Sequence, residues 1–491
     1  MIRYYYVLPH DNQLLFMTID KRAIFINTAS QVIVRILTLA LSLVSIKLLT
    51  NYLGVFGVGQ YNTINTYAGM IIVMADLGLF SVAVREIIKN PAEEKKILAN
   101  VLTVRVISAL LAAIVSATLV YSTKYDPAIK MGVLIASAYI FFNLIGSVYD
   151  VYLQARLKMQ YSAVSEFISR LISLSALAIV IYFHGHFYLV VATIGLYGLV
   201  TFALKYYFGR RFLKFGFAYD KELALKIMNM AWPLGLVFIV NNIFFKLDTL
   251  MLFAIKGADA VGIYSVAFRV LEVTTFVGGF FANSLFPVIS KNISNNKARV
   301  GAVVSRATTI MLLLALPITL LCLVLPKEII LFLSNSDFVS GAPALVILAF
   351  TLPLIYCDIL LGSVLIANDE RKYMIKIAIF ILLFNFLANL YMISRFSFMG
   401  AAITTLVSEL VLVVVNYYYI KRVIVCRFDY RQIGKIIAIA LLSFAVGYLL
   451  KNWIANFVVT GVLVVGIYTI LAWAMNVINI GQIRALVKAE E

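Results

Sequence analysis

Apolar runs of about 20 residues, the length at which a helix crosses the roughly 30 Å hydrocarbon core of a bilayer, recur along the whole chain. Short polar segments separate them. The runs lack the alternation of apolar and polar residues that marks barrel strands. The pattern therefore predicts an all-α polytopic membrane protein with fourteen transmembrane helices, at 22–48, 61–83, 98–121, 131–153, 162–183, 187–208, 228–253, 261–289, 303–325, 343–366, 373–394, 399–420, 433–450 and 454–478.

Composition agrees with this pattern and excludes several classes of protein. Hydrophobic residues make up 63% of the 491 residues and mean hydropathy is +0.99, against roughly 45–50% apolar content in soluble domains. Cys322, Cys357 and Cys426 stand singly, without metal-ligand spacing. The chain has no phosphate-binding loop and no external loop long enough for an enzymatic site. We expect no enzyme, no resident cofactor and no nucleic-acid partner, despite a net charge of +18.

The distribution of the cations predicts the orientation. Loops on the amino-terminal side hold 28 Lys and Arg residues, counted from Lys21 to Lys488, whereas loops on the opposite side hold six. The positive-inside rule therefore places both termini in the cytoplasm of a protein in the cell membrane. An even number of spans is required for this, and fourteen satisfies it.

Two copies of one unit are visible in the sequence. Gly54-x4-Gly59-x-Tyr61 returns as Gly257-x4-Gly262-x-Tyr264 at an offset of 203, and Ala155-x5-Tyr161 returns as Ala367-x5-Tyr373 at 212. Six spans per copy make parallel repeats, a plan in which transporters bind substrate between the halves. The predicted domains are a tail (1–21), an N-lobe (22–208), a cytoplasmic linker helix (209–227), a C-lobe (228–420) and two extra spans within 433–478.

Charged residues inside the spans are the candidate functional residues, because a charge near mid-bilayer costs about 2.5–3.5 kcal/mol on insertion scales. The deep cations are Arg35, Arg105, Lys246 and Arg269. Guanidinium groups suit an anionic headgroup, since Arg binds phosphate oxygens in a bidentate manner. The alternative is structural ion pairing, for which Arg269 and Glu272 have helical spacing.

A second candidate site consists of oxygen-bearing side chains. Asn385 and Asn389 share one face of span 11, Thr405 lies in span 12, and Asp248 lies in span 7. Together they offer ligands to a small cation such as Na⁺; the alternative is hydrogen bonding between helices. Asp76 is a further candidate for ion coupling.

Asp150, Glu166 and Lys47 are expected to have local roles. Asp150 is expected to pair with Arg156 or Lys158, Glu166 with Arg170 at i, i+4, and Lys47 to extend to the membrane surface. These expectations treat the residues as structural.

Five segments together resemble the polysaccharide-biosynthesis (oligosaccharide or O-antigen-type) flippases, of the superfamily that includes lipid II flippases and multidrug-and-toxin extruders. They are LTNYLGVFGVGQY (49–61), ADLGL (75–79), VREI (84–87), VGIYSVAFRVLE (261–272) and LFPVIS (285–290). The resemblance covers residues 22–425. Fourteen spans depart from the twelve of typical O-antigen flippases.

The resemblance implies a two-lobed transporter that moves a polyprenyl-(pyro)phosphate-linked oligosaccharide from the cytoplasmic to the outer leaflet by alternating access. Arg35 and Arg269 match the cavity arginines that engage the pyrophosphate. Related members hold Na⁺ between spans 7, 11 and 12, so Na⁺ or H⁺ is a possible coupling ion. Its partners would be the lipid-linked saccharide, membrane lipid and glycosyltransferases or a polymerase of the same pathway. The alternatives are a cation-coupled multidrug exporter of the same fold and a membrane-embedded polymerase.

Overall fold

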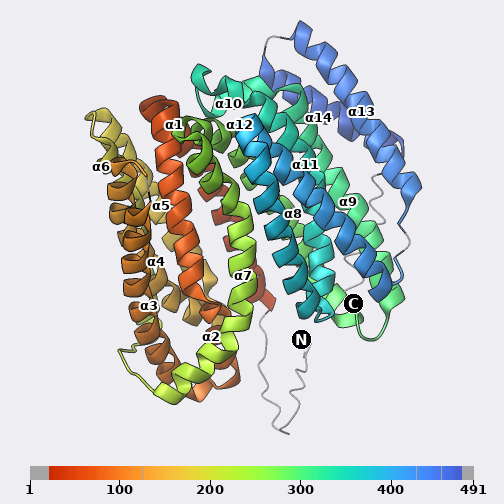
Figure 1. The fold of residues 1–491 in the computed structure, drawn as a ribbon. Coiled ribbons are helices and arrows are strands. Elements are labelled where there is room, and N and C mark those ends of the chain that lie inside the picture. Colours follow the sequence, from red (N-terminus) through yellow and green to blue (C-terminus); the bar gives the residue numbers. More distant parts are fainter. Residues whose placement is uncertain (1–20, 124, 427, 455, 478–491) are drawn as a thin grey trace. The chain divides into compact units, whose positions relative to one another are not determined.

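The computed structural model describes residues 21–477 except 124, 427 and 455, and these residues form helices and no strands (Figure 1). The predicted tail therefore lies outside the described residues, apart from Lys21. The helices are α1 (Lys21–Asp76), α2 (Leu79–Lys89), α3 (Glu94–Ser122), α4 (Pro127–Ala155), α5 (Met159–Tyr182), α6 (Phe187–Phe212), α7 (Lys221–Lys256), α8 (Ala258–Asn292), α9 (Lys297–Val324), α10 (Pro326–Leu333), α11 (Ala342–Ala367), α12 (Arg371–Val423), α13 (Tyr430–Trp453) and α14 (Phe457–Ala474).

Twelve helical segments of the described chain are long and apolar enough to cross a membrane. Two of them contain a non-helical residue, Gly54 in α1 and Ser397 in α12, and each of these consists of two helices. The bend at Ser397 is a hairpin, because Asn385 before it bonds Ser408 after it. The two extra helices bring the total to fourteen, which confirms the predicted fold class.

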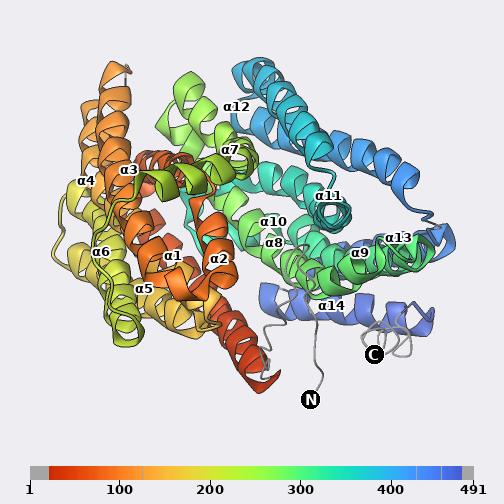
Figure 2. The ribbon, with the colours of Figure 1, turned by 90° about the horizontal axis from the view of Figure 1, so that it is seen from below.

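The chain divides into two compact units. The first unit comprises the residues up to Ser45 and Ala68–Phe238; the second comprises Ile46–Tyr67 and everything from Ile239 onward. The tip of the first helical pair, around Gly54, therefore belongs to the second unit. In that unit α13 and α14 pack against each other and against α9, which gives the extra spans their place (Figures 1 and 2).

The repeated glycine signature forms a helix crossing inside the second unit. A Cβ atom on Gly59 would overlap the carbonyl oxygen of Ala258, and a Cβ on Gly262 would overlap that of Val55. Gly59 and Gly262 are equivalent at the offset of 203, and so are Val55 and Ala258. The contact is therefore reciprocal, which is the property of a local two-fold axis.

A hydrogen bond lies at the centre of this crossing. Asn62 donates from Nδ2 to Ser265 Oγ at 2.9 Å, and these two residues are also separated by 203 positions. Glycine permits the approach because it has no side chain between the backbones. The glycine signature that repeats in the sequence therefore forms a contact between its two copies.

The predicted linker helix at 209–227 is wrong in its centre. Residues 213–220 have no regular structure, and α7 begins at Lys221. Side chains of α3 bond this segment instead, since Thr103 Oγ1 donates to Ala218 O at 2.8 Å and Asn100 Oδ1 accepts from Asp220 N at 2.7 Å. The Asp220 carboxylate then accepts the backbone N–H groups of the first turn of α7, so its capping role starts the helix there.

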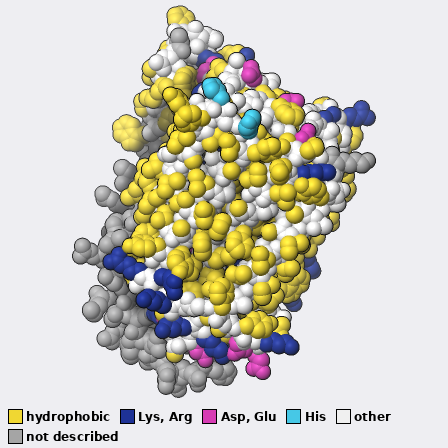
Figure 3. All heavy atoms as spheres, turned by 90° about the vertical axis from the view of Figure 1, so that its left-hand side faces the viewer, with side chains coloured by type: hydrophobic (Ala, Val, Ile, Leu, Met, Phe, Trp, Pro, Cys, Tyr) yellow, Lys and Arg dark blue, Asp and Glu magenta, His cyan; other side chains and the backbone are white. Residues whose placement is uncertain are grey.

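The surface has the pattern of a membrane protein. On α3, Ile107, Leu110, Leu111 and Ile114 are exposed at i, i+3, i+4 and i+7, which is one helix face. Figure 3 shows hydrophobic side chains over the middle of the visible face, with Lys and Arg gathered toward its lower end. Such an apolar belt is suited to lipid, and the chain is a multi-pass membrane protein.

Candidate functional site

Three partly exposed charged side chains meet in the second unit. The Arg269 Nη1 atom lies 2.7 Å from Glu272 Oε2, and the Lys246 Nζ atom lies 3.7 Å from Glu272 Oε1. Lys246 precedes the end of α7 by ten residues and Arg269 follows the start of α8 by eleven. At 1.5 Å per residue, both lie about 15 Å from the turn at Gly257, which is half of a hydrocarbon core of about 30 Å.

The charges of this cluster do not cancel. Two cations share one carboxylate, so the three side chains carry a net charge of one positive unit. Lys246 and Arg269 are each 28% exposed and Glu272 is 37% exposed. Arg269 and Glu272 are the ion pair considered in the sequence, but Lys246 makes the cluster a candidate anion site instead of a closed pair.

The predicted oxygen cluster is assembled in the second unit. Asp248 accepts hydrogen bonds from Thr405 Oγ1 at 2.5 Å and from Asn389 Nδ2 at 2.6 Å, with Tyr264 OH at 3.3 Å. Asn389 also donates to Asn385 Oδ1 at 2.9 Å. Residues from α7, α8 and both halves of α12 thus converge on one buried carboxylate, and Tyr264 is a member that the sequence did not identify.

The donor set of this cluster suits a small hard cation. Asp248 is 4% exposed, and its neighbours among the described residues are hydrogen-bonding groups, without a cation. The Oδ1 atom of the buried Asn389 has no hydrogen-bond partner there. A buried charge and an orphaned oxygen in one place leave ligands available for a cation such as Na⁺. Groups of three or more His, Cys, Asp or Glu that would hold a metal are absent from the described chain.

Two other acids, the half-buried Asp358 and the buried Glu409, lie in the second unit without an ion pair in the described chain. Asp358 on α11 accepts a hydrogen bond from Asn416 Nδ2 at 2.8 Å. Glu409 is 2% exposed and follows Thr405 by one helical turn on α12.

Arg105 and Asp76 form a pair in the first unit. Arg105 is fully buried, and its Nη2 donates to Asp76 Oδ1. Asp76 also accepts from the backbone N–H of Gly78 at 3.1 Å, so the carboxylate joins α3 to the turn before α2. The guanidinium of Arg105 is closed to solvent in this conformation, and its Nε and Nη1 have no partner among the described residues.

Arg35 is half-buried in α1 of the first unit, whereas Arg269 belongs to the second unit. The prediction that the two arginines line one substrate cavity stays a prediction.

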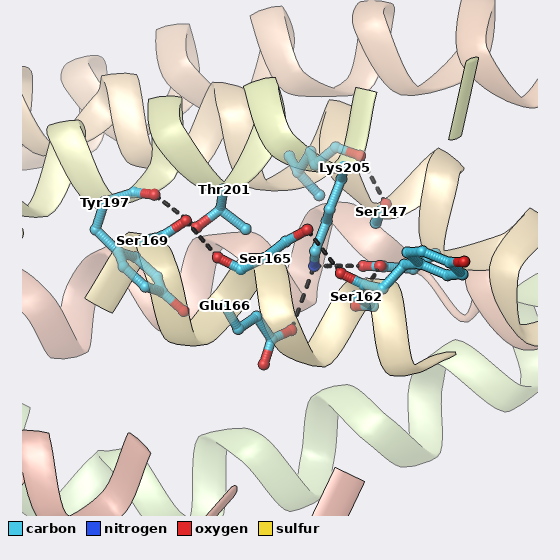
Figure 4. A network of polar contacts seen from close by, with 11 residues as sticks. Ser147, Ser162, Ser165, Glu166, Ser169, Tyr197, Thr201 and Lys205 are labelled. Carbon is cyan, nitrogen blue, oxygen red and sulfur yellow. Dashed lines mark hydrogen bonds and ion pairs between the residues drawn. The ribbon is translucent and has the colours of Figure 1, made fainter. Parts of the chain in front are cut away.

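The expected pairing of Asp150 with Arg156 or Lys158, and of Glu166 with Arg170, is wrong. Lys205 on α6 lies 2.7 Å from Asp150 Oδ2 on α4 and 3.3 Å from Glu166 Oε1 on α5. Figure 4 shows the Lys205 side chain reaching toward Glu166 and Ser162, and Ser162 Oγ donates to Asp150 Oδ1 at 2.6 Å. Arg156 instead pairs with Glu94.

The sequence gives Lys205 no separate role, because it lies only three residues before the predicted end of its span, at 208, and counts among the loop cations. Its side chain is only 7% exposed. Its depth was the available signal, since α6 continues to Phe212. Lys47 donates to the carbonyl oxygens of Leu331, at 2.7 Å, and Ser334, at the carboxyl end of α10, and its extension to the membrane surface stays a prediction.

A bundle of paired repeats with charged clusters inside its spans defines the class of the protein as a polytopic membrane transporter. Residues 22–293 match the family described as "Polysaccharide biosynthesis protein", and 233–391 match the family MatE. The first match covers more than half of the chain. The chain therefore belongs to the polysaccharide biosynthesis protein family, within a superfamily shared with multidrug extruders.

A curated relative and two solved structures resemble the chain. It is 28% identical over 175 residues to "Probable low-salt glycan biosynthesis flippase Agl15" of Haloferax volcanii, a match that covers 35% of this chain and 37% of that protein. A lipid II flippase MurJ structure in an inward closed conformation has a TM-score of 0.76 at 18% identity, covering 92% of this chain and 99% of the other. An inward-facing multidrug MATE transporter has a TM-score of 0.61 at 14% identity, covering 80% and 98%. These structures establish the fold.

Proposed function

We propose that this protein is a flippase that moves a polyprenyl-(pyro)phosphate-linked oligosaccharide from the cytoplasmic to the outer leaflet by alternating access. The observation that carries the proposal is the Lys246–Glu272–Arg269 cluster, with its net positive charge about 15 Å along the helices from the turn at Gly257. Membership of the polysaccharide biosynthesis family and similarity to a glycan flippase support it. The protein acts as a transporter and forms no covalent product.

The chemistry of the substrate explains why such a cluster is needed. A diphosphate headgroup loses its hydration when it enters the bilayer interior, at a cost of many kcal/mol unless it is paired. Arg269 offers a planar guanidinium that binds two phosphate oxygens, and Lys246 adds an ammonium. Glu272 compensates part of this charge before the substrate arrives, and a diphosphate would replace it as the partner of both cations.

The oxygen cluster around Asp248 supplies the proposed coupling of transport to a cation gradient. A Na⁺ ion held by Asp248, Asn389 and Thr405 would tie the conformation of α7 to that of α12, since both contribute ligands. With both termini in the cytoplasm of a cell-membrane protein, net negative charge moves outward. An outward-positive potential favours that movement by about 2.3 kcal/mol per charge per 100 mV. Glycosyltransferases that build the headgroup and a polymerase that consumes it are the expected pathway partners.

Proteoliposomes test the proposal directly. The probe is a fluorescent polyprenyl-diphosphate-linked sugar, and a membrane-impermeant quencher reports its arrival in the outer leaflet. Lys246→Ala and Arg269→Ala each remove a charge-assisted hydrogen bond of about 1.5–3 kcal/mol, so each should slow flipping about tenfold or more. Glu272→Gln should strengthen binding of the same probe, because it removes the competing carboxylate. The opposite signs distinguish an anion site from a structural ion cluster.

Arg156→Ala is the matched control, because Arg156 forms a one-to-one pair with Glu94 near the end of α4. It should flip at the wild-type rate. Wild-type rates in Lys246→Ala, in Arg269→Ala and in the double variant would overturn the anion site.

The match of residues 233–391 to MatE favours a second candidate, a cation-coupled multidrug exporter. An exporter would move a cationic dye out of the same vesicles and ignore the diphosphate probe. Transport of the dye with no flipping would replace the flippase proposal by this one.

A further inference from the structure

Glu409 on α12 has no part in the proposed function so far. It is 2% exposed, and its carboxylate has no ion pair and no hydrogen bond among the described residues. Asp358 on α11 and Asp248 on α7 both lie close enough to repel it electrostatically. A buried carboxylate without a partner has a high free energy, because little water solvates it. A positively charged partner would stabilise Glu409, and the described residues provide none.

Thr351 on α11 is a second buried polar side chain without a partner. It is fully buried, and its Oγ1 atom has no hydrogen bond in the described part of the chain. Thr351 and Asp358 are two helical turns apart, so they share one face of α11. Glu409 and Asn416 share one face of α12 by the same spacing. The two faces meet, because Asn416 Nδ2 donates to Asp358 Oδ1 at 2.8 Å.

The register of the two helices places Thr351 opposite Glu409. The second half of α12 runs parallel to α11, because a short turn between them and the hairpin at Ser397 each reverse the chain. Parallel helices keep a constant separation in sequence between residues at one level. Asn416 is 58 positions after Asp358. Glu409 is also 58 positions after Thr351. An unpartnered carboxylate and an unpartnered hydroxyl thus lie at one level of the bundle.

The first repeat shows what kind of partner these groups would accept. There the Lys205 ammonium lies between two carboxylates of neighbouring helices. In the second repeat the amide of Asn416, one residue from the position that the 212-residue offset gives for Lys205, bonds Asp358 instead. Asp358 and Glu409 therefore have no ammonium or guanidinium between them in the described chain. A free cation would supply the charge that Lys205 supplies in the first repeat.

We propose that Glu409, Thr351 and Asp358 bind a Na⁺ ion, at a second position one helical turn along α12 from the Asp248 cluster. The ligands are the Glu409 carboxylate, the Thr351 hydroxyl and the second carboxylate oxygen of Asp358, beside the one that accepts from Asn416. Such oxygen ligands suit a small hard cation. The cation site itself does not depend on transport, whereas its part in coupling rests on the proposed function.

A chain of polar side chains leads from this position to the turn between α11 and α12. Tyr373 OH donates to Asn416 Oδ1 at 2.9 Å, and the rings of Tyr373 and Tyr419 stack with their centroids 3.5 Å apart. Tyr419 OH donates to Glu370 Oε2 at 2.6 Å. Glu370 lies in that turn and is partly exposed. A cation enters along these oxygens, so the position at Glu409 is reached from the Glu370 end of the bundle.

Cation binding to the purified protein tests the site without transport. The probe is radioactive Na⁺ in a scintillation binding assay, with choline chloride holding the ionic strength constant. Wild type should bind two Na⁺ ions per chain. Glu409→Gln and Asp248→Asn should each bind one, because each removes the carboxylate of one position. Glu328→Gln is the matched control: Glu328 is an acid of the same unit that pairs with Lys451 at 3.0 Å, and this variant should bind two.

Thr351→Val distinguishes a ligand from a packing residue, because valine keeps the shape of threonine without its hydroxyl. It should weaken the binding of one of the two ions about tenfold or more, the scale seen when even the outer partners of a bound metal are removed. In Na⁺-free buffer its melting temperature should equal or exceed that of wild type, since a buried hydroxyl without a partner is destabilising. A packing role alone would leave Na⁺ affinity unchanged.

The outcomes separate the cation site from the proposed function. A Glu409→Gln variant that binds as many ions as wild type, or an unchanged Na⁺ affinity in Thr351→Val, would overturn the second position. A wild type that binds two ions but does not flip the diphosphate probe would keep the site and remove the flippase function. Flipping by a wild type that binds no Na⁺ would do the reverse. In proteoliposomes, a flipping rate that keeps its full dependence on a Na⁺ gradient in Glu409→Gln would refute the part of this position in coupling.

Discussion

Replacing Gly262 by Ala should destabilise the protein through one methyl group. The new Cβ would overlap the carbonyl oxygen of Val55 and lie 3.1 Å from its Cγ1. Backbone cannot move aside as the end of a flexible side chain does, so the helices must separate. Overpacking of this kind costs about 1–3 kcal/mol, and the better helix propensity of Ala returns at most about 1 kcal/mol. A net loss of up to about 3 kcal/mol follows.

Gly279 is the control, because it lies in the same helix and a Cβ there meets nothing within 4 Å. Gly279→Ala should be neutral or stabilising by up to about 1 kcal/mol. A thiol-reactive dye in a melting assay follows unfolding, since Cys322 is buried and reacts when the helices open. Equal melting temperatures for the two variants would show that the crossing is not tightly packed. Gly59→Ala should match Gly262→Ala, because the contact is reciprocal.

Three further predictions concern charged groups. Asp248→Asn should abolish any dependence of flipping on a Na⁺ gradient while leaving binding of the diphosphate probe intact; a gradient dependence that persists would remove Asp248 from the coupling site. Asp76→Asn should lower the free energy of unfolding by about 3–5 kcal/mol, because it leaves the fully buried Arg105 without its counter-charge; a melting temperature near that of wild type would contradict this. The Lys96 ammonium, which donates to Asp220, and the backbone N–H of Leu223 hold the pKa of Asp220 below its ordinary value of 3.8. This carboxylate therefore stabilises the fold above pH 3.8, and its contribution is lost as pH falls through the lowered value. The difference in melting temperature between wild type and Asp220→Asn should be present at pH 7 and shrink in acid.

The sequence predicts the spans well because each is a local property of some 20 consecutive residues. The partners of the charged residues depend on contacts between helices, so they are harder to predict from the sequence. Asp150 had two cations within eight residues, yet it pairs with Lys205, 55 positions away. Lys205 reaches it because α4 and α6 are neighbours, and no pattern within either span shows this.

The residues of the oxygen cluster could be predicted for a different reason. Asn385 and Asn389 share a face by helical spacing, and the sequence groups them with Asp248 and Thr405 by their oxygen ligands; the family resemblance adds that related members hold Na⁺ between spans 7, 11 and 12. Tyr264 was missed although it ends the repeated signature, because a tyrosine at helical spacing reads as packing. The prediction of a linker helix was wrong because its basic residues suggested an interfacial helix. Hydrogen bonds from side chains of α3 instead hold residues 213–220 without regular structure.

The two repeats clarify which part of the Lys205 cluster is structural. In the second copy, Asp358 of span 10 bonds Asn416 of span 12 at 2.8 Å, as Asp150 of span 4 bonds Lys205 of span 6. Asp358 lies four residues, and Asn416 one residue, from the positions that the 212-residue offset predicts. An aspartate joined to the sixth span is thus common to both copies and serves to hold those helices together.

Glu166 has no acidic counterpart, because the offset of 212 leads to Ala378. The second copy also replaces the ammonium by an amide, so it has no cation for a second acid to share. The extra carboxylate and the lysine that holds it are therefore particular to the first repeat, where one ammonium joins α4, α5 and α6.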